Sequence, residues 1–289
     1  MAQVVISGYA TVDYVVHAQG RFDGQGTMAM RAAPDGAWPR AGGAVLYAGR
    51  QLARAGHGVR ALTWVGGDAD GAFYRQAAAQ AGLGPDGIAD TDGPTTRCLL
   101  VYHADGSHGC LLQAGAAALS DMQRGLLHGA ALLVLTAGPA SVNRAILADL
   151  PADARLAWIV KPDPVCFPPD LAGALAARAD WLFCNAGERA WLEAARDGCG
   201  GSRPPSGQTL FETHGGEGVR VMVGVDGDGV TLPTTRTLAV TDATGAGDSF
   251  AGATLAALLY GASPAAAAQA GMQAAAALLA TRISPAATP

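Results

Sequence analysis

The chain has 289 residues, half of them apolar and 15% charged, with a formal net charge of −5. This apolar content excludes an intrinsically disordered chain. A slightly acidic chain without a long basic run also argues against nucleic acid or an anionic membrane as the partner. A globular protein with a large core and a small-molecule partner is predicted.

The N-terminal segment predicts a core strand rather than a signal peptide, because it lacks a basic stretch and Asp13 interrupts its apolar run. Five cysteines form no C-x-x-C pair and no zinc pattern: Cys98, Cys110, Cys166, Cys184 and Cys199. Reduced thiols and a cytoplasmic location are therefore expected. Gly261 and Pro264 interrupt the alanine-rich C-terminal stretch, which predicts helices of a soluble protein rather than a membrane span.

The first third of the chain combines two strands, two helices and a hairpin. A strand at 4–7 is followed by a Gly- and Pro-rich segment, 17–41, for which loops and one or two exposed strands are expected. Apolar spacing then predicts, in order, a helix at 44–55, a strand at 59–65 and a helix at 72–81. Runs 97–102 and 108–113 flank an Asp-Gly turn at 104–106 and predict a β-hairpin.

From residue 120 onward, short strands and helices alternate. Strands are predicted at 131–135, 155–160, 180–184, 209–213, 219–225 and 235–240. Helices are predicted at 121–128, 141–149, 170–178, 186–195 and 250–260, with a surface loop at 204–207 and a frayed tail at 284–289. This alternation indicates β-α-β units and a mainly parallel sheet, with ligands beyond the carboxyl ends of its strands.

The segment Asp242-Ala243-Thr244-Gly245-Ala246-Gly247-Asp248 lies between the last predicted strand and the helix at 250–260. Its glycines allow the backbone to approach a ligand closely, and free amides at the start of a helix favour an anion. Asp248 is suited to accept a proton from a hydroxyl beside that anion. Phosphoryl transfer to an alcohol is predicted. An ordinary β-α loop in which Asp248 caps the helix is the alternative.

This segment resembles the C-terminal signature of the ribokinase/PfkB family of carbohydrate kinases, D-T-x-G-A-G-D, and departs from it only at Ala243. Other landmarks follow in family order: Gly42-Gly43, the V-G-x-D-x-x-G of Val65–Gly71, the N-x-x-E of Asn185–Glu188, and the glycine loop Thr213–Gly218. The resemblance covers about residues 4–280. It implies one α/β domain over 1–289, a ribokinase-like three-layer sandwich with a mainly parallel central sheet. A small β lid is expected from segments near 14–31 and 94–113, and a homodimer through that lid is a further expectation.

The resemblance also implies ATP-dependent phosphorylation of a hydroxyl on a sugar or sugar-like polyol. Asp248 is the expected base, and the amides of Gly245, Ala246 and Gly247 the expected anion site. Contacts with ATP are expected from Thr213, Gly215, Gly218 and Thr244. Asn185 and Glu188 are expected to hold Mg²⁺ through bound water, because Mg²⁺ keeps most of its waters in proteins; an N-cap asparagine with a first-turn glutamate is the other interpretation. The resemblance also implies that K⁺ can be needed beside this signature, as it is in some family members, and the oxygens near Asp242 are where such a site is expected.

The expected substrate residues are Asp13, Gly42, Gly43, Tyr47 and Arg97. A carboxylate such as Asp13 can accept two hydrogen bonds from a polyol, and a turn-forming role is the alternative. Tyr47 stands where many members carry Asn, and its ring can stack on a base. A nucleoside kinase is therefore the alternative to a sugar kinase, and a non-catalytic ligand-sensing protein is the alternative from another class. Lys161 at a strand end either meets a phosphate or is solvated. Vitamin kinases of this fold are disfavoured, because they often carry a cysteine within the signature.

Overall fold

The computed structural model of the chain describes residues 1–21, 23–30, 38–103, 107–151, 153–198, 207–224, 229–234, 238, 240 and 242–282. These residues form two sheets and eight α-helices. The predicted turn at 104–106, most of the predicted loop at 204–207 and strand at 235–240, and the tail at 284–289 lie outside the described residues.

The central sheet has nine strands in the order β13-β12-β11-β10-β9-β8-β1-β4-β5. Their bounds are β1 Gln3–Ser7, β4 Gly58–Gly66, β5 Ile88–Thr91, β8 Leu132–Leu135, β9 Arg155–Ile159, β10 Trp181–Asn185, β11 Thr209–Thr213, β12 Val219–Val223 and β13 Val230–Leu232. Pairing is parallel from β5 to β11 and antiparallel at β12 and β13. The reversal follows from chain length, because the few residues between β11 and β12 are too short for a helical crossover. The predicted mainly parallel sheet is confirmed.

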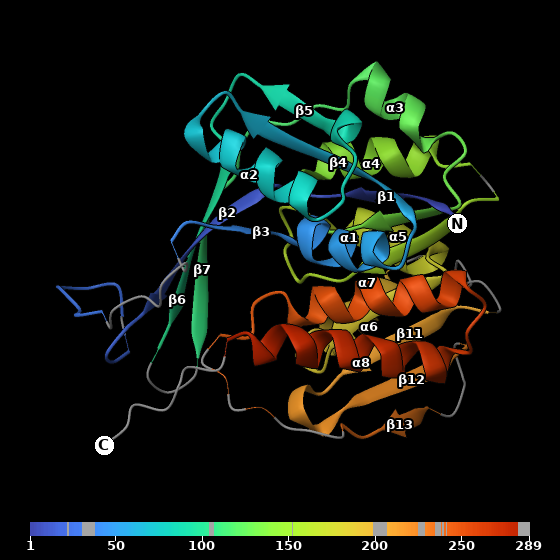
Figure 1. Cartoon of the computed structure of the whole chain (residues 1–289). Helices are drawn as coiled ribbons and strands as arrows, with labels where there is room; N and C mark the ends of the chain where they lie inside the picture. The colour runs from blue at the N-terminus through green and yellow to red at the C-terminus, as the bar shows by residue number, and fades with distance from the viewer. Residues whose placement is uncertain are drawn as a thin grey trace.

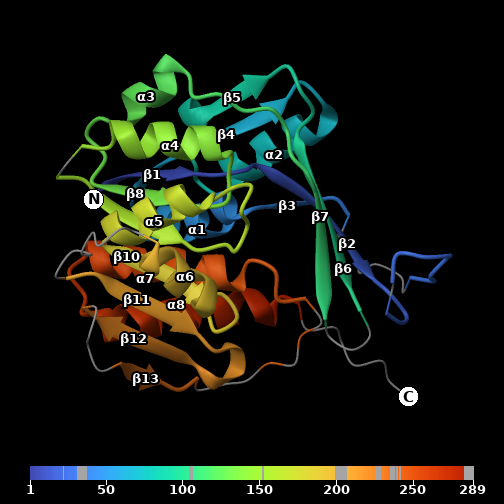
Figure 2. The same cartoon turned by 180° about the vertical axis from the view of Figure 1, so that it is seen from behind.

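Helices cover both faces of this sheet (Figures 1 and 2). One face carries α1 Ala44–Arg54, α2 Ala69–Gln80, α7 Ala246–Leu259 and α8 Pro264–Ala280, and the other α3 Asp121–Leu127, α4 Ala140–Asp149, α5 Pro169–Arg178 and α6 Arg189–Asp197. Val4 packs into the first core and its neighbour Val5 into the second, as the alternation of a strand requires. The three-layer sandwich is therefore confirmed. Among the described helices, none is both long enough and apolar enough to cross a membrane.

A second sheet of four strands projects from one side of the sandwich (Figure 1). It consists of β2 Thr11–His17, β3 Arg40–Gly42, β6 Thr96–Tyr102 and β7 His108–Gln113, in the order β3-β2-β6-β7. This sheet is the expected lid, and β6 and β7 form the predicted hairpin. Its first segment is displaced from the predicted 14–31, because β2 begins at Thr11 and pairs with β6 on one side and β3 on the other. Between 18 and 30, the described residues contribute one isolated bridge, from Ala18 to Met30.

Candidate active site

The Asp242–Asp248 segment turns the chain onto α7, as predicted. Gly245 is the N-cap residue, with a φ of 77°, and no side chain caps the helix. A Cβ atom at Gly245 would lie 2.5 Å from the ring of Tyr47, so both the backbone conformation and the space require glycine. Because no side chain caps α7, Asp248 is not held as a helix cap, and its carboxylate remains available for another role.

The first turn of α7 offers amides to a ligand. Gly247 and Asp248 are the second and third residues of the helix, whose N–H groups have no partner within it. The Ala246 amide, by contrast, already donates to the Ala243 carbonyl oxygen at 3.1 Å. A Cβ atom at Gly247 would meet no atom within 4 Å. The N–H groups of Gly247 and Asp248 therefore lie, without a partner in the helix, at its positive end, where an anion is stabilised.

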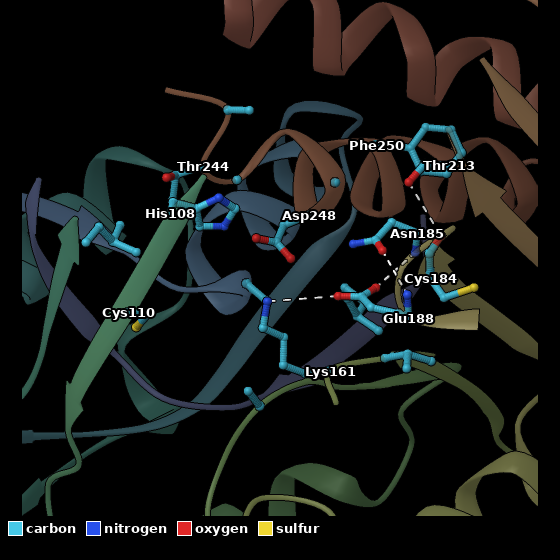
Figure 3. A pocket seen from close by; sticks show the side chains of 18 of the residues that line it. His108, Cys110, Lys161, Cys184, Asn185, Glu188, Thr213, Thr244, Asp248 and Phe250 are labelled. Carbon is cyan, nitrogen blue, oxygen red and sulfur yellow. Dashed lines mark hydrogen bonds and ion pairs between the residues drawn. The ribbon is translucent and has the colours of Figure 1, made fainter. Parts of the chain in front are cut away.

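This turn borders a cavity of about 720 Å³ between the lid and the carboxyl ends of the strands. A volume of this order accommodates a small organic ligand. Figure 3 shows Asp248 pointing into the cavity, with Lys161, Asn185 and Glu188 on one side and His108 of the lid on another. The described lining also includes Thr213, Thr244, Gly245, Gly247, Tyr102 and Cys110. The cavity thus brings together the signature and the two predicted nucleotide motifs.

Asp248 is a weaker acid than an ordinary aspartate. Its carboxyl group is only partly exposed, and burial raises its pKa to about 6. The carboxylates of Glu188 and Asp13 add to this effect, while Lys161 opposes it. A carboxylate with a pKa near the working pH is a much better general base than an ordinary aspartate.

Asn185 and Glu188 close a turn just before α6. The Asn185 amide N–H donates to Glu188 Oε2 at 2.9 Å, and the Glu188 amide N–H donates to Asn185 Oδ1 at 3.0 Å. The second carboxylate oxygen, Oε1, lies 3.9 Å from Lys161 Nζ (Figure 3). Burial raises the pKa of Glu188, and nearby Lys161 partly offsets this. Glu188 Oε1 thus keeps lone pairs for the water shell of a metal ion, which suits the predicted water-mediated contact with Mg²⁺.

The loop between β11 and β12 contains the predicted glycine motif. Gly215 and Gly218 have φ values of 56° and 123°. A Cβ atom at Gly218 would lie 2.1 Å from the Leu232 carbonyl oxygen, so this glycine permits close packing against β13. Thr213 lines the cavity and donates to the Cys184 carbonyl oxygen at 3.4 Å, whereas neither glycine is among the described lining residues. The structure therefore places Thr213 at the cavity and assigns Gly218 a packing role.

The chain's family follows from the whole sequence. A model of the pfkB family of carbohydrate kinases matches residues 1–288. The chain belongs to the pfkB family. No curated protein matches it at a significant level.

Solved structures show the same fold as this pfkB family chain. A ribokinase from Cryptococcus neoformans var. grubii serotype A, in complex with ADP, superposes with a TM-score of 0.80 at 23% identity, over 96% of this chain and 94% of that one. An Arabidopsis thaliana ribokinase with ribose and ATP gives 0.74 at 20% identity, over 96% and 93%. A Burkholderia thailandensis nucleoside kinase with inosine gives 0.78 at 18% identity, over 96% and 90%.

Three of the predicted substrate residues, Asp13, Gly42 and Gly43, lie in or next to the β2–β3 pair of the lid. Asp13 is 3% exposed and accepts a hydrogen bond from Thr11 Oγ1 at 2.8 Å. Burial raises its pKa, against that hydrogen bond and the charge of Arg40. Gly43 caps α1 with a φ of 85° and Gly42 packs on Asp13, so both glycines have a packing role here. None of these three predicted residues, nor Tyr47, is among the described residues that line the cavity.

Arg97 is engaged at the base of the lid. Its Nε lies 2.5 Å from Asp70 Oδ2, and its Nη2 lies 3.4 Å from Asp68 Oδ2. Both aspartates belong to the predicted V-G-x-D-x-x-G motif, and Asp68 also caps α2 through the Gly71 amide. The motif and Arg97 therefore fasten β6 to α2, and Arg97 is not among the described lining residues.

Two arginines outside the sequence motifs converge on Asp242. Arg40 Nη1 lies 2.5 Å from Asp242 Oδ2, and Arg282 Nη1 lies 3.4 Å from Oδ1. Tyr102 of the lid also donates to Oδ1, at 2.9 Å. Burial alone would raise the pKa of Asp242, but the hydrogen bond and charge of Arg40 outweigh it and hold the pKa well below the usual range. Asp242 thus already has two cationic partners, and the described donor set does not fit a potassium ion.

The lid also presents a stack of three rings to the cavity. His17 and Tyr102 have ring centroids 5.4 Å apart, and Tyr102 and His108 have centroids 5.3 Å apart, both in stacked orientation. All three residues line the cavity. Each ring belongs to a different lid strand, and the three rings are brought together only when these strands pair in one sheet. The sequence alone therefore does not predict the stack.

Proposed function

We propose that this chain transfers the γ-phosphoryl group of ATP to a hydroxyl of a sugar or sugar-like polyol. The observation that carries the proposal is the geometry of Asp248. Its carboxylate faces the cavity from the first turn of α7, with a pKa raised to about 6 and the free amides of the same turn beside it. A base next to an anion site is the arrangement that phosphoryl transfer to an alcohol requires.

In the proposed reaction, Asp248 accepts the proton of the attacking hydroxyl. The amides of Gly247 and Asp248, with the α7 N-terminus, stabilise the charge that develops on the transferred phosphoryl oxygens. The Thr213 and Thr244 hydroxyls line the same cavity and are placed to donate to donor phosphates. The Ala246 amide has a smaller role than its place in the signature indicates, because it is already bonded to Ala243.

Asn185 and Glu188 would hold Mg²⁺ through water molecules. Bound there, the ion would neutralise charge on the donor phosphates. Among the described residues, no group of three or more His, Cys, Asp or Glu side chains converges on a common metal site.

ATP as the donor is supported by the solved structures of the same fold, in which ribokinases hold ADP or ribose with ATP. A sugar or polyol acceptor is supported by the match to a family of carbohydrate kinases. A nucleoside acceptor is the second candidate. The lid ring stack of His17, Tyr102 and His108 favours it, because a flat base can stack on such rings. The nucleoside kinase with bound inosine has the same fold.

The proposal is tested by measuring ADP release from Mg-ATP with a panel of sugars, polyols and nucleosides, beside the Asp248→Asn variant. Substrate-dependent release that disappears in the variant supports the kinase and selects its acceptor class. The contrary result is ligand binding without turnover in the wild-type protein, detected by a thermal shift. That result would favour a ligand-sensing protein of this fold.

A further inference from the structure

The guanidinium group of Arg282 lies among the oxygen atoms of the signature turn. Its Nη1 donates to the Thr244 carbonyl oxygen and lies 3.4 Å from both the carbonyl oxygen and Oδ1 of Asp242. Its Nη2 donates to the Tyr47 hydroxyl at 3.1 Å, and the group lies over the Tyr47 ring, 5.8 Å from its centre. Backbone carbonyls, a carboxylate and a hydroxyl are hard oxygen ligands of the kind that an alkali cation takes. In this structure these oxygen atoms already surround the positively charged guanidinium group of Arg282.

A second positive charge adjoins the first. The Arg40 guanidinium binds the other carboxylate oxygen of Asp242 at 2.5 Å. The side chains of Arg40, Asp242 and Arg282 are only 19%, 10% and 12% exposed, so solvent screens their interactions weakly. A dissolved cation entering this place would meet the fixed positive charges of Arg40 and Arg282, whose Coulomb repulsion would oppose its binding. The nearby Asp13 carboxylate interacts electrostatically with both arginines and offsets part of this repulsion.

The cluster is joined directly to the reacting end of α7. Asp242 Oδ1 accepts the Thr244 amide at 2.9 Å, which closes the turn immediately before Gly245. Arg282, at the end of α8, therefore ties the last helix to the two residues that set the direction of the signature turn. Tyr47 connects the same turn to α1, because the Gly245 backbone packs on its ring. Displacing Arg282 would loosen the turn that presents the amides of Gly247 and Asp248.

We propose that the Arg282 guanidinium acts as a built-in cation at the signature turn, in the place of the potassium ion that some relatives need, so that this chain works without potassium. Arg282 is a positioning residue in this scheme, since it acts through the turn. The inference rests on the proposed kinase function for its activity readout, but its stability readout is independent of any turnover.

The activity test compares wild type and Arg282→Ala in potassium chloride and in tetramethylammonium chloride at matched ionic strength. Wild-type turnover is expected to be equal in the two salts. The turnover rate of Arg282→Ala is expected to be lower by about tenfold or more, the order expected when charge-assisted hydrogen bonds are removed. Added guanidinium or potassium should restore part of that activity. A wild-type rate that rises severalfold in potassium alone would overturn the proposal.

The stability test uses thermal unfolding of the same proteins and needs no substrate. Wild type should melt at the same temperature in both salts, whereas Arg282→Ala should melt lower and recover in potassium or dilute guanidinium. Arg282→Lys keeps the positive charge but loses the planar guanidinium group. Its melting temperature should therefore lie between those of wild type and Arg282→Ala. Arg144→Ala, which removes a surface ion pair with Asp170, is the matched control. A potassium-specific rise in the wild-type melting temperature, or an Arg282→Ala variant that melts like wild type, would overturn the proposal even if no acceptor is found.

Discussion

The Asp13 carboxylate occupies the place where a side chain at residue 42 would begin. A Cβ atom built on Gly42 would lie 2.0 Å from Asp13 Oδ2, across the β2–β3 pair of the lid. The predicted glycine pair and the predicted aspartate are therefore one structural unit. The absent side chain allows Asp13 to bury its carboxylate beside Thr11.

Gly42→Ala should push Asp13 out of this position. We expect a loss of about 1 to 3 kcal/mol of unfolding free energy from overpacking, together with a rise in KM for the acceptor that exceeds any rise in KM for ATP. Thermal unfolding and steady-state kinetics measure both. Gly67→Ala is the matched control, because a Cβ atom there would meet nothing within 4 Å. Equal changes in the KM values for the acceptor and for ATP would mean that the packing of Asp13 on Gly42 has only a structural role.

Asp248→Asn should reduce kcat by roughly 10² to 10⁴, the usual contribution of a general base. Nucleotide affinity, measured by calorimetry, should change little, since the α7 amides remain. Near-normal turnover in this variant would remove Asp248 from the mechanism.

The same variant should change stability in a pH-dependent way. The raised pKa of Asp248 means that the folded state binds its proton more tightly than the unfolded state does. The free energy of unfolding therefore falls as the pH rises from the ordinary aspartate range through about 6. Asparagine carries no charge and therefore avoids the destabilisation caused by ionising Asp248 in the folded protein. Asp248→Asn should have a higher melting temperature than wild type at pH 7, and the two melting temperatures should converge near pH 4. Equal melting temperatures at pH 7 would contradict the raised pKa.

The pH dependence of turnover follows from the same carboxyl group. Because the deprotonated form is the base, kcat/KM should fall as the pH drops through about 6, the pKa to which burial raises Asp248 in the free protein. Lys161→Met removes the positive charge that favours the ionised carboxylate of Asp248. In this variant, the fall of kcat/KM at low pH should therefore begin at a higher pH than in wild type. A limb near pH 4 in wild type would show that Asp248 ionises as an ordinary aspartate.

Features that depend on neighbouring residues in the chain were predictable from the sequence. Alternating apolar runs define the β-α-β order, because each strand and helix carries its own periodicity. Asp248 and the glycines beside it share one contiguous signature, so their common place at the start of α7 needs no tertiary information. The hairpin of β6 and β7 is similarly local.

Features that depend on distant segments were not predictable. Arg282 and Asp242 are 40 residues apart, and two helices, α7 and α8, lie between them in the chain, so nothing in the sequence indicates their contact. Arg40 lies in a three-residue strand, β3, which is too short for its apolar spacing to predict it. Asp13 was expected at a strand end facing the ligand, but it lies within β2, where pairing with β3 directs its side chain onto Gly42.

Gly247→Ala should separate folding from catalysis. A Cβ atom at this position meets no atom within 4 Å and the backbone is not left-handed, so the variant should melt at or slightly above the wild-type temperature, because alanine favours a helix over glycine. The added methyl group projects into the space expected for the transferred phosphoryl group, and turnover should fall by roughly 10² to 10³, the range typical for the loss of one anion-site donor. Gly125→Ala on α3 is an equally open control and should keep full activity. Full activity in Gly247→Ala would place the phosphoryl group elsewhere.

The lid offers a surface for self-association. β7 is an edge strand whose six residues are all exposed, and Leu111 and Leu112 are 68% and 42% exposed. An exposed apolar edge strand is a template for pairing with a second chain. We therefore expect a homodimer formed through the lid, with twice the chain mass in light scattering after gel filtration. Leu111→Lys should shift this species to monomer, while Val165→Lys, at an equally exposed apolar residue outside the lid, should not. A wild-type protein that remains monomeric at high concentration would exclude this dimer and leave β7 as a solvated edge.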